Sequence, residues 1–214
     1  MFFEKLATGP LSVNTYLIGD DSGTECIVID PGDAEPVIAA LHHAGRTCAL
    51  ILITHGHFDH IWGVADLAGA TSAPVAVHEL DVEKLQSDQK SLAYLIGKRL
   101  PAARATQLLR DDDIVQAAGL TLRVLHTPGH SEGGVAYVLD EQRMVFCGDT
   151  LFLDGAGRTD FPGGSQETLF HSITDRLFAL EGSYDVFPGH GGGTTLEHER
   201  QHNPLVLLGR RLRW

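Results

Sequence analysis

Histidines and aspartates gather where four apolar runs of the sequence end. Each run is followed, at once or within a few residues, by side chains that can bind a metal ion. The four segments are residues 51–60 (ILITHGHFDH), 125–130 (LHTPGH), 145–149 (VFCGD) and 186–190 (VFPGH). Strand ends deliver side chains to a common cleft in layered α/β proteins, so we expect these four segments to converge on one site.

The segments contain seven candidate metal ligands. In extended backbone, residues two apart point to the same side, so His55 and His57 can bind one ion. Asp59 and His60, at the start of the next helix, face a second position. A catalytic zinc takes three or four protein ligands, and seven are therefore too many for one ion. If Asp149 bridges, the ligands divide into His55, His57, His130 and Asp149 for one ion and Asp59, His60, His190 and Asp149 for the other.

Such a pair of ions has a definite chemistry. Two cations about 3.5–4 Å apart lower the pKa of a shared water and polarise a substrate carbonyl, which is the chemistry of a metallohydrolase. A single histidine is more often a structural residue than a ligand. Four metal-capable side chains within six residues, followed by three more after apolar runs, favour a metal centre over that alternative.

The elements that must position these side chains follow from the hydrophobic pattern. Apolar runs between turn residues predict strands at 2–7, 13–18, 26–29, 49–53, 75–78, 114–116, 120–125, 135–139, 144–147 and 184–187. Helices are expected at 34–44, 58–68 and, after Ser165 as N-cap, up to about residue 180. Residues 81–110 are expected to form a helical or irregular insertion, and the glycine-rich residues 151–164 a loop over the site. Two strand-rich parts, each followed by a helix, predict two stacked sheets flanked by helices.

Composition narrows the class of protein. The 214 residues carry 16 basic and 28 acidic side chains, a net charge of −12 at pH 7, which argues against a nucleic-acid partner. No apolar stretch approaches the roughly 18 residues of a membrane span, and Glu4 and Lys5 interrupt any secretory signal. We therefore expect a cytoplasmic protein with neither a membrane nor a nucleic-acid partner.

The cysteines fit the same expectation. Cys26, Cys48 and Cys147 are odd in number and form no C-x-x-C pair, so neither a disulfide framework nor a thiolate zinc site is predicted. Cys147 precedes Asp149 by two residues and so shares its side of the strand. We interpret all three as buried core residues of a chain in a reducing compartment.

The pattern T-H-x-H-x-D-H at residues 54–60, with His130, Asp149 and His190 after it, resembles the metallo-β-lactamase superfamily. The resemblance runs from the strands at 13–30 to His190. It implies one α/β domain, residues 1–214, with an αββα sandwich of two mixed β-sheets flanked by helices and the metals at the sheet edge. Asp30 matches the acidic residue of that family's first motif, and it would orient a ligand rather than bind metal.

Residues 148–152 (GDTLF) and 155–164 (GAGRTDFPGG) resemble the glyoxalase II-like branch, particularly its short single-domain bacterial members. That resemblance implies hydrolysis of a small thioester such as S-lactoylglutathione, by attack of a metal-bridging hydroxide on the carbonyl, with Asp59 assisting the proton transfer. Arg158 matches the basic residue of the thiol-binding pattern, whereas Asp160 stands where the larger enzymes have tyrosine. Only 24 residues follow His190, so we expect no counterpart of the long helical C-terminal domain that adds glutathione contacts in those enzymes.

Several alternatives stay open from sequence. Two zinc ions are expected, while imidazole and carboxylate ligands also accept iron or manganese. A persulfide dioxygenase of the same superfamily would use one iron held by His55, His130 and Asp149, and a lactonase would need the same metals with another pocket. A non-catalytic metal-binding domain is a further alternative. Arg158 binds a substrate carboxylate or pairs with Asp154 or Asp160. The chain is a monomer or a small homo-oligomer, and the basic tail at residues 210–213 pairs with acidic neighbours or with another subunit.

Overall fold

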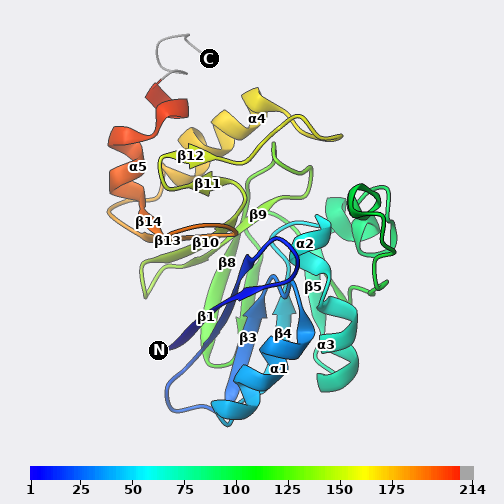
Figure 1. Cartoon of the computed structure of the whole chain (residues 1–214). Coiled ribbons are helices and arrows are strands. Elements are labelled where there is room, and N and C mark those ends of the chain that lie inside the picture. Colours follow the sequence, from blue (N-terminus) through cyan, green and yellow to red (C-terminus); the bar gives the residue numbers. More distant parts are fainter. Residues whose placement is uncertain (208–214) are drawn as a thin grey trace.

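Two six-stranded β-sheets lie face to face in the computed structural model, which describes residues 1–207 (Figure 1). The first sheet has the order β1-β2-β3-β4-β5-β6, antiparallel up to β3 and parallel from β3 onward. Its strands are β1 (Phe2–Thr8), β2 (Val13–Gly19), β3 (Glu25–Ile29), β4 (Thr47–Leu52), β5 (Val75–His78) and β6 (Gln107–Leu109).

The second sheet is mixed as well, in the order β14-β13-β10-β9-β8-β7, with β10 and β13 parallel and the other neighbours antiparallel. Its strands are β7 (Ile114–Ala117), β8 (Leu120–His126), β9 (Val135–Leu139), β10 (Met144–Gly148), β13 (Asp185–Pro188) and β14 (Thr194–Thr195). A small hairpin of β11 (Leu151–Phe152) and β12 (Gly155–Ala156) follows β10.

Helices cover the outer face of each sheet (Figure 1). Over the first sheet lie α1 (Ala34–His43), α2 (Phe58–Ile61) and α3 (Val64–Thr71), and the 3₁₀ helices η1 (Glu79–Gln86) and η2 (Ala93–Ile96) follow β5. Over the second sheet lie α4 (Gln166–His171), its π-helical continuation η3 (Ser172–Leu177) and α5 (Leu196–His202). The predicted αββα sandwich of two mixed sheets is confirmed.

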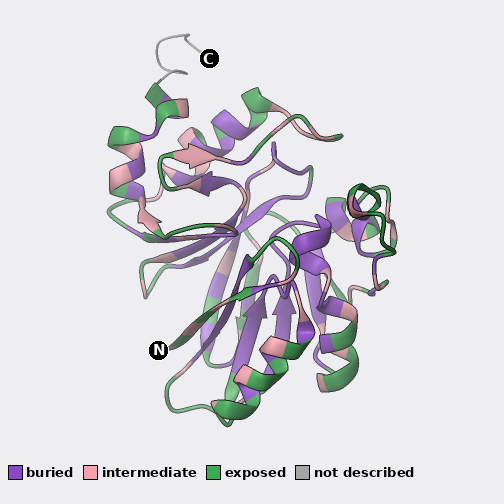
Figure 2. Cartoon of the chain, in the orientation of Figure 1, coloured by how far each residue is buried: buried purple, intermediate pink, exposed green. Residues whose placement is uncertain are grey.

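Alternation along the strands explains the layers. In β3, Val28 packs toward the helices while Ile27 and Ile29 pack between the sheets. In β9, Val138 packs toward the helices of the second sheet while Tyr137 packs between the sheets. Because successive strand side chains point to opposite faces, strands that are apolar at every position must be covered on both sides. Figure 2 shows the buried strands at the centre of the molecule accordingly.

Three expected elements were wrong in detail. The single helix at 58–68 is two helices, because Gly63 lies against the backbone that leads into α1 and donates its N–H to the Pro31 carbonyl at 2.9 Å. The helix after Ser165 leaves α-geometry at Ser172 and ends at Leu177 instead of near 180. The loop at 151–164 contains the β11–β12 hairpin.

Three further elements were not predicted from the sequence. Strand β6 lies inside the insertion expected to be helical or irregular, and it forms the edge of the first sheet beside β5. The pattern did not predict β14 and α5. No helix within residues 1–207 is long and apolar enough to cross a membrane. The basic tail at 210–213 lies outside the described residues.

Candidate metal centre

The ends of four strands, drawn from both sheets, deliver the seven candidate ligands to one edge of the sandwich. His55 and His57 follow β4, and Asp59 and His60 lie in the first turn of α2. The loop after β8 carries His130, Asp149 follows β10 directly, and His190 follows β13. The predicted convergence of the four segments is therefore present in the fold.

Two tyrosines packed between the sheets fix two of these strand ends. The Tyr137 hydroxyl donates to the Ile53 carbonyl at 2.7 Å, two residues before His55. The Tyr16 hydroxyl donates to the Pro188 carbonyl at 2.6 Å, two residues before His190. Each buried hydroxyl thereby satisfies a carbonyl in a segment that carries a candidate ligand.

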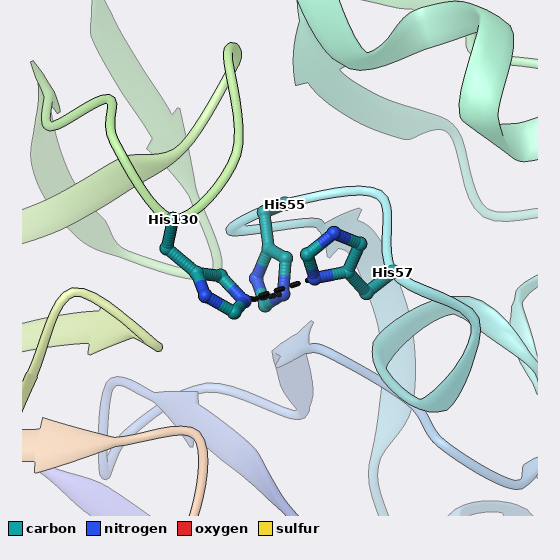
Figure 3. A group of neighbouring side chains, drawn as sticks. All are labelled: His55, His57 and His130. Atoms are coloured by element: carbon teal, nitrogen blue, oxygen red, sulfur yellow. Dashed lines mark hydrogen bonds between the residues drawn. The ribbon is translucent and has the colours of Figure 1, made fainter. Parts of the chain in front are cut away.

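His55, His57 and His130 form the first donor group (Figure 3). Nε2 of His130 lies 2.9 Å from Nδ1 of His57 and 3.2 Å from Nε2 of His55. All three rings are buried. Three imidazole nitrogens thus point at one another among rings that are largely shielded from solvent.

The outer partners of two rings fix which nitrogens carry protons. Nδ1 of His130 donates to the Arg158 carbonyl at 2.7 Å, and Nδ1 of His55 faces the Thr54 hydroxyl at 3.2 Å. With the protons on these outer nitrogens, the two Nε2 atoms present lone pairs to each other. Lone pairs at 3.2 Å repel unless a cation lies among them, so the group fits a metal ion.

Asp59, His60 and His190 form the second donor group, and Asp149 lies between the groups. Nε2 of His190 is 3.0 Å from an oxygen of Asp59. The carboxylate of Asp149 directs Oδ1 at His60 Nε2, 3.4 Å away, and Oδ2 at His130 Nε2, 3.6 Å away. This placement is the one expected of a carboxylate that bridges two ions.

Two buried polar atoms, one in the second donor group and one in Asp149, have no hydrogen-bond partner within residues 1–207; they are His60 Nε2 and Asp149 Oδ1. An unpaired buried polar atom is costly, and such atoms are rare in folded proteins. Both are ordinary metal-ligand atoms. Nitrogen and oxygen donors of this kind suit zinc, iron or manganese, so the second group also fits a divalent cation.

Asp30 contacts His60 of the second donor group directly and reaches His55 of the first group through Thr54. Its Oδ2 accepts hydrogen bonds from His60 Nδ1 at 2.8 Å and from the Thr54 hydroxyl at 2.5 Å, and its Oδ1 accepts the Thr54 N–H at 2.7 Å. The Thr54 hydroxyl in turn faces His55. One carboxylate therefore orients a ring of each donor group.

Burial and charge set the protonation of the histidines. Burial lowers the pKa of His55 well below its usual range and the pKa of His57 to about 3. Both rings are therefore neutral at pH 7, the form that binds a metal. Burial alone would lower the pKa of His60 too, but the carboxylates of Asp59 and Asp149 hold that pKa well above its usual range. The same negative field stabilises a bound cation.

Sequence reasoning missed a buried ion pair behind the first donor group. Asp81, within the expected insertion, accepts hydrogen bonds from the Gly56 N–H at 2.7 Å, the Lys84 ammonium at 2.7 Å, the Ser131 hydroxyl at 2.5 Å and the Gly133 N–H at 2.8 Å. Asp81 and Lys84 are both buried. The pair ties the His55–His57 loop to the His130 loop. The spacing of Asp81 and Lys84, one helical turn, was the available signal, but it is common on exposed surfaces.

A cavity of about 610 Å³ opens above the donor groups. Its polar lining consists of His57, Asp59, His130, Asp149, Arg158 and His190. The remaining lining is apolar and consists of Leu11, Phe58, Leu92, Leu95, Ile96, Phe152, Ala156 and Phe161. A mostly apolar cavity with a few converging polar groups is the usual form of a small-molecule site.

Arg158 lies at the rim of this cavity and is exposed. It donates two hydrogen bonds to Asp160, at 2.7 and 2.6 Å, and its guanidinium lies 4.0 Å from the centre of the Phe161 ring. Of the two pairings weighed from sequence, the structure shows the one with Asp160. Asp154 instead contacts His198 at 2.8 Å.

Cys26, Cys48 and Cys147 are buried and unpaired, as predicted. The Cys147 thiol donates to the Leu151 carbonyl at 3.2 Å. Burial raises the pKa of Cys147 to about 12, so the thiol is neutral at pH 7. The side chain belongs to the core between the second sheet and its helices.

Curated relatives of similar length include proteins with and without an assigned activity. The chain is 34% identical over 219 residues to an uncharacterized protein of Mycobacterium tuberculosis, with 96% of this chain and 98% of the relative covered. It is 34% identical over 209 residues to the probable metallo-hydrolase YqgX of Bacillus subtilis, with the same coverage. It is 30% identical over 195 residues to the hydroxyacylglutathione hydrolase GloC of Haemophilus influenzae, with 90% and 92% covered.

Solved structures share the fold. BLEG-1 B3 metallo-beta-lactamase superposes with a TM-score of 0.91 at 35% identity, covering 96% of this chain and 99% of the other. TTHA1623 in a di-iron-bound form superposes with a TM-score of 0.84 at 37% identity, covering 94% of this chain and 98% of the other. ETHE1 from Myxococcus xanthus superposes with a TM-score of 0.80 at 30% identity, covering 100% of this chain and 92% of the other.

The family-level comparison covers the whole of the site. The sequence pattern of the Metallo-beta-lactamase superfamily matches residues 8–190, which include the strands from β2 to β13 and all seven candidate ligands. This match extends over far more than half of the 214 residues. The chain therefore belongs to the metallo-beta-lactamase superfamily.

Proposed function

We propose that the protein is a metal-dependent hydrolase of a small thioester such as S-lactoylglutathione. One observation carries the proposal: two donor groups face each other across the Asp149 carboxylate at the floor of a cavity large enough for a small molecule. Similarity to the hydroxyacylglutathione hydrolase GloC of Haemophilus influenzae supports the choice of substrate class.

We assign one divalent ion to His55, His57, His130 and Asp149, and a second to Asp59, His60, His190 and Asp149. Zinc is the ion we favour, while iron fits the same donors and occurs in the similar structure of TTHA1623. When bound, two such ions supply an acidified water and polarise the substrate carbonyl. The orientation of the ligands then depends on Asp30 and on the Asp81 pair.

Asp59 is the residue we assign to proton handling. Burial alone would raise its pKa, but His60 and the hydrogen bond from His190 outweigh burial and lower the pKa below its usual range. The carboxylate is therefore ionised and can orient the attacking water through one oxygen. That water adds to the thioester carbonyl, the carbon–sulfur bond breaks, and the water's proton passes to the leaving thiolate, giving a carboxylic acid and a thiol.

Arg158 is assigned to the thiol side of the substrate. Its guanidinium at the cavity rim can bind a carboxylate of a peptide-like thiol, because the planar fork of N–H groups matches that group. Asp160 occupies two of these donors, so a substrate carboxylate must share or displace it.

A persulfide dioxygenase is the second candidate. His130 lies 3.2 Å from His55 and 3.6 Å from Asp149, and these two histidines and one carboxylate are the ligand types of mononuclear iron oxygenases. The complete second donor group weighs against this candidate, since a single iron leaves Asp59, His60 and His190 without a ligand role.

The test combines elemental analysis with an assay panel. The purified protein should hold close to two equivalents of metal and release thiol from S-lactoylglutathione. A lactone serves as the comparison substrate, and oxygen uptake with glutathione persulfide reports the dioxygenase. Fewer than one metal per chain, or no cleavage of any acyl thiol, overturns the proposal. Oxygen uptake by the iron-loaded protein establishes the second candidate in its place.

A further inference from the structure

The cavity above the metal centre has a wall of leucine and isoleucine side chains that the proposed chemistry does not use. We propose that this wall binds the acyl group of the substrate, and that the preferred thioesters carry an apolar acyl chain longer than acetyl. The inference rests on the proposed thioester hydrolysis and narrows its substrate class.

The wall comes from two segments that lie far apart in the sequence. Leu95 and Ile96 belong to η2, Leu92 is the residue directly before that helix, and Leu11 belongs to the turn between β1 and β2. Leu95 is 53% exposed and Leu11 is 52% exposed. Single exposed leucines are ordinary on a surface, but these line the same cavity. An apolar ligand group would remove both from water.

Leu92 shows that the wall is held in place. Its backbone is left-handed, with a φ of 67°, a conformation that is unfavourable for a bulky residue and that glycine adopts freely. The side chain is nevertheless buried and lines the cavity. The strained backbone therefore directs a leucine to a position where glycine would be easier to accommodate.

The charges at the cavity leave little to attract a polar acyl group. Arg158 is the only lysine or arginine among the lining residues that the structure describes. Asp160 neutralises it through two hydrogen bonds. Since Arg158 is assigned to the thiol, the apolar lining of the cavity is left for the acyl group. A short hydroxylated group such as lactoyl gains little from that surface, so longer apolar chains are the better substrates.

The experiment uses the metal-loaded protein and S-acyl-N-acetylcysteamine thioesters with acetyl, butyryl and hexanoyl groups. A neutral, constant thiol leaves chain length as the only variable. Each buried methylene should raise kcat/KM by about threefold, so hexanoyl, with four more methylenes than acetyl, should exceed it by about eightyfold. A ratio below about threefold would show that the wall does not bind the acyl group.

Leu95→Ser is the variant that tests the wall itself. It should reduce the hexanoyl-to-acetyl ratio about fivefold to tenfold, because one apolar contact surface is removed. Leu108→Ser is the matched control, since Leu108 is 56% exposed on β6 and is not a lining residue. The control should keep the wild-type ratio. Equal ratios in both variants overturn the proposal. The proposal is also overturned if Leu95→Ser converts an oligomer to a smaller species and leaves the hexanoyl-to-acetyl ratio unchanged. The leucines would then pack against another copy of the chain.

A binding measurement separates this inference from the proposed function. The thioethers S-methyl- and S-hexyl-N-acetylcysteamine cannot be hydrolysed, and their affinities can be compared by calorimetry. Tighter binding of the hexyl compound by wild type, lost in Leu95→Ser, supports the apolar wall even if no thioester is cleaved. Cleavage of thioesters without any chain-length preference in rate or binding supports hydrolysis and overturns the wall.

Discussion

His60 donates a hydrogen bond from Nδ1 to Oδ2 of Asp30 at 2.8 Å, and both side chains are buried. The bond leaves the other nitrogen of His60 without a partner within the described chain, facing Asp149 at 3.4 Å. Asp30 thereby decides which nitrogen of His60 carries the proton and which is free to bind a metal. A carboxylate in this position also makes the ring a stronger donor toward the ion.

The variant Asp30→Asn should weaken metal binding. An asparagine offers one acceptor oxygen where Asp30 accepts three hydrogen bonds through two, and its NH₂ group would oppose the His60 N–H. The metal affinity should fall about 10- to 100-fold, measured by competition with a chromophoric chelator. The exposed Asp66→Asn serves as the control and should bind metal like wild type. Unchanged affinity in Asp30→Asn would contradict the orienting role.

Position 189, next to the candidate ligands, accommodates only glycine. A Cβ atom placed there would lie 2.2 Å from Oδ1 of Asp149 and 2.5 Å from Cε1 of His60. Gly189→Ala should therefore displace both ligands and lower metal content below one equivalent per chain, measured by elemental analysis. Gly192→Ala is the matched control, because a Cβ there meets nothing within 4 Å. Full metal content in Gly189→Ala would show that the backbone can move aside at little cost.

Much of this structure could be predicted from local patterns in the sequence. The alternation and apolar runs around β3, β4 and β9 predicted two covered sheets, and the strand ends predicted where His55, Asp149 and His190 would meet. These predictions succeed because the polarity of a strand and the residue that ends it are local properties. Asp30 could be placed only through the resemblance, since a lone aspartate before Pro31-Gly32 is a common turn signal.

Features that depend on contacts between residues far apart in the sequence could not be predicted from it. The break after α2 depends on the contact of Gly63 with the carbonyl of Pro31, and the pattern of residues 58–68 alone favours one helix. The Asp81 ion pair depends on Ser131, fifty residues away. Leu92 adopts its left-handed backbone because tertiary packing overrides local preference, so the apolar wall had no sequence signal either.

The Asp81 pair gives a prediction about stability. Asp81→Asn should destabilise the protein by about 3 kcal/mol, because it leaves the buried Lys84 ammonium without its counter-charge. Glu83→Gln is the control, since Glu83 pairs with Lys90 on the surface and such pairs contribute at most about 1 kcal/mol. Urea unfolding of both variants measures the difference. Equal free energies of unfolding would show that the buried pair contributes no more to stability than the surface pair.

The same residue predicts a pH dependence. Burial alone would raise the pKa of Asp81, but Lys84 outweighs it and the pKa lies below its usual range. A carboxyl group with a lowered folded-state pKa contributes stability above its unfolded pKa, and that stability is lost as the pH falls toward the folded value. Wild type should therefore lose more stability than Asp81→Asn between about pH 5 and pH 3. Parallel stability curves would contradict the ionised pair.

Substitutions of Arg158 and of Asp160 should have opposite effects on substrate binding. Arg158→Ala removes the cation at the cavity rim and should raise KM for S-lactoylglutathione with little change in kcat, because the side chain contacts the thiol end and not the reacting carbonyl. Asp160→Asn releases two guanidinium donors and should lower KM for the same substrate. For the neutral acetyl-N-acetylcysteamine thioester, neither variant should change KM, since that thiol carries no carboxylate. A fall in kcat with KM unchanged in Arg158→Ala would show that the residue acts on the reaction itself.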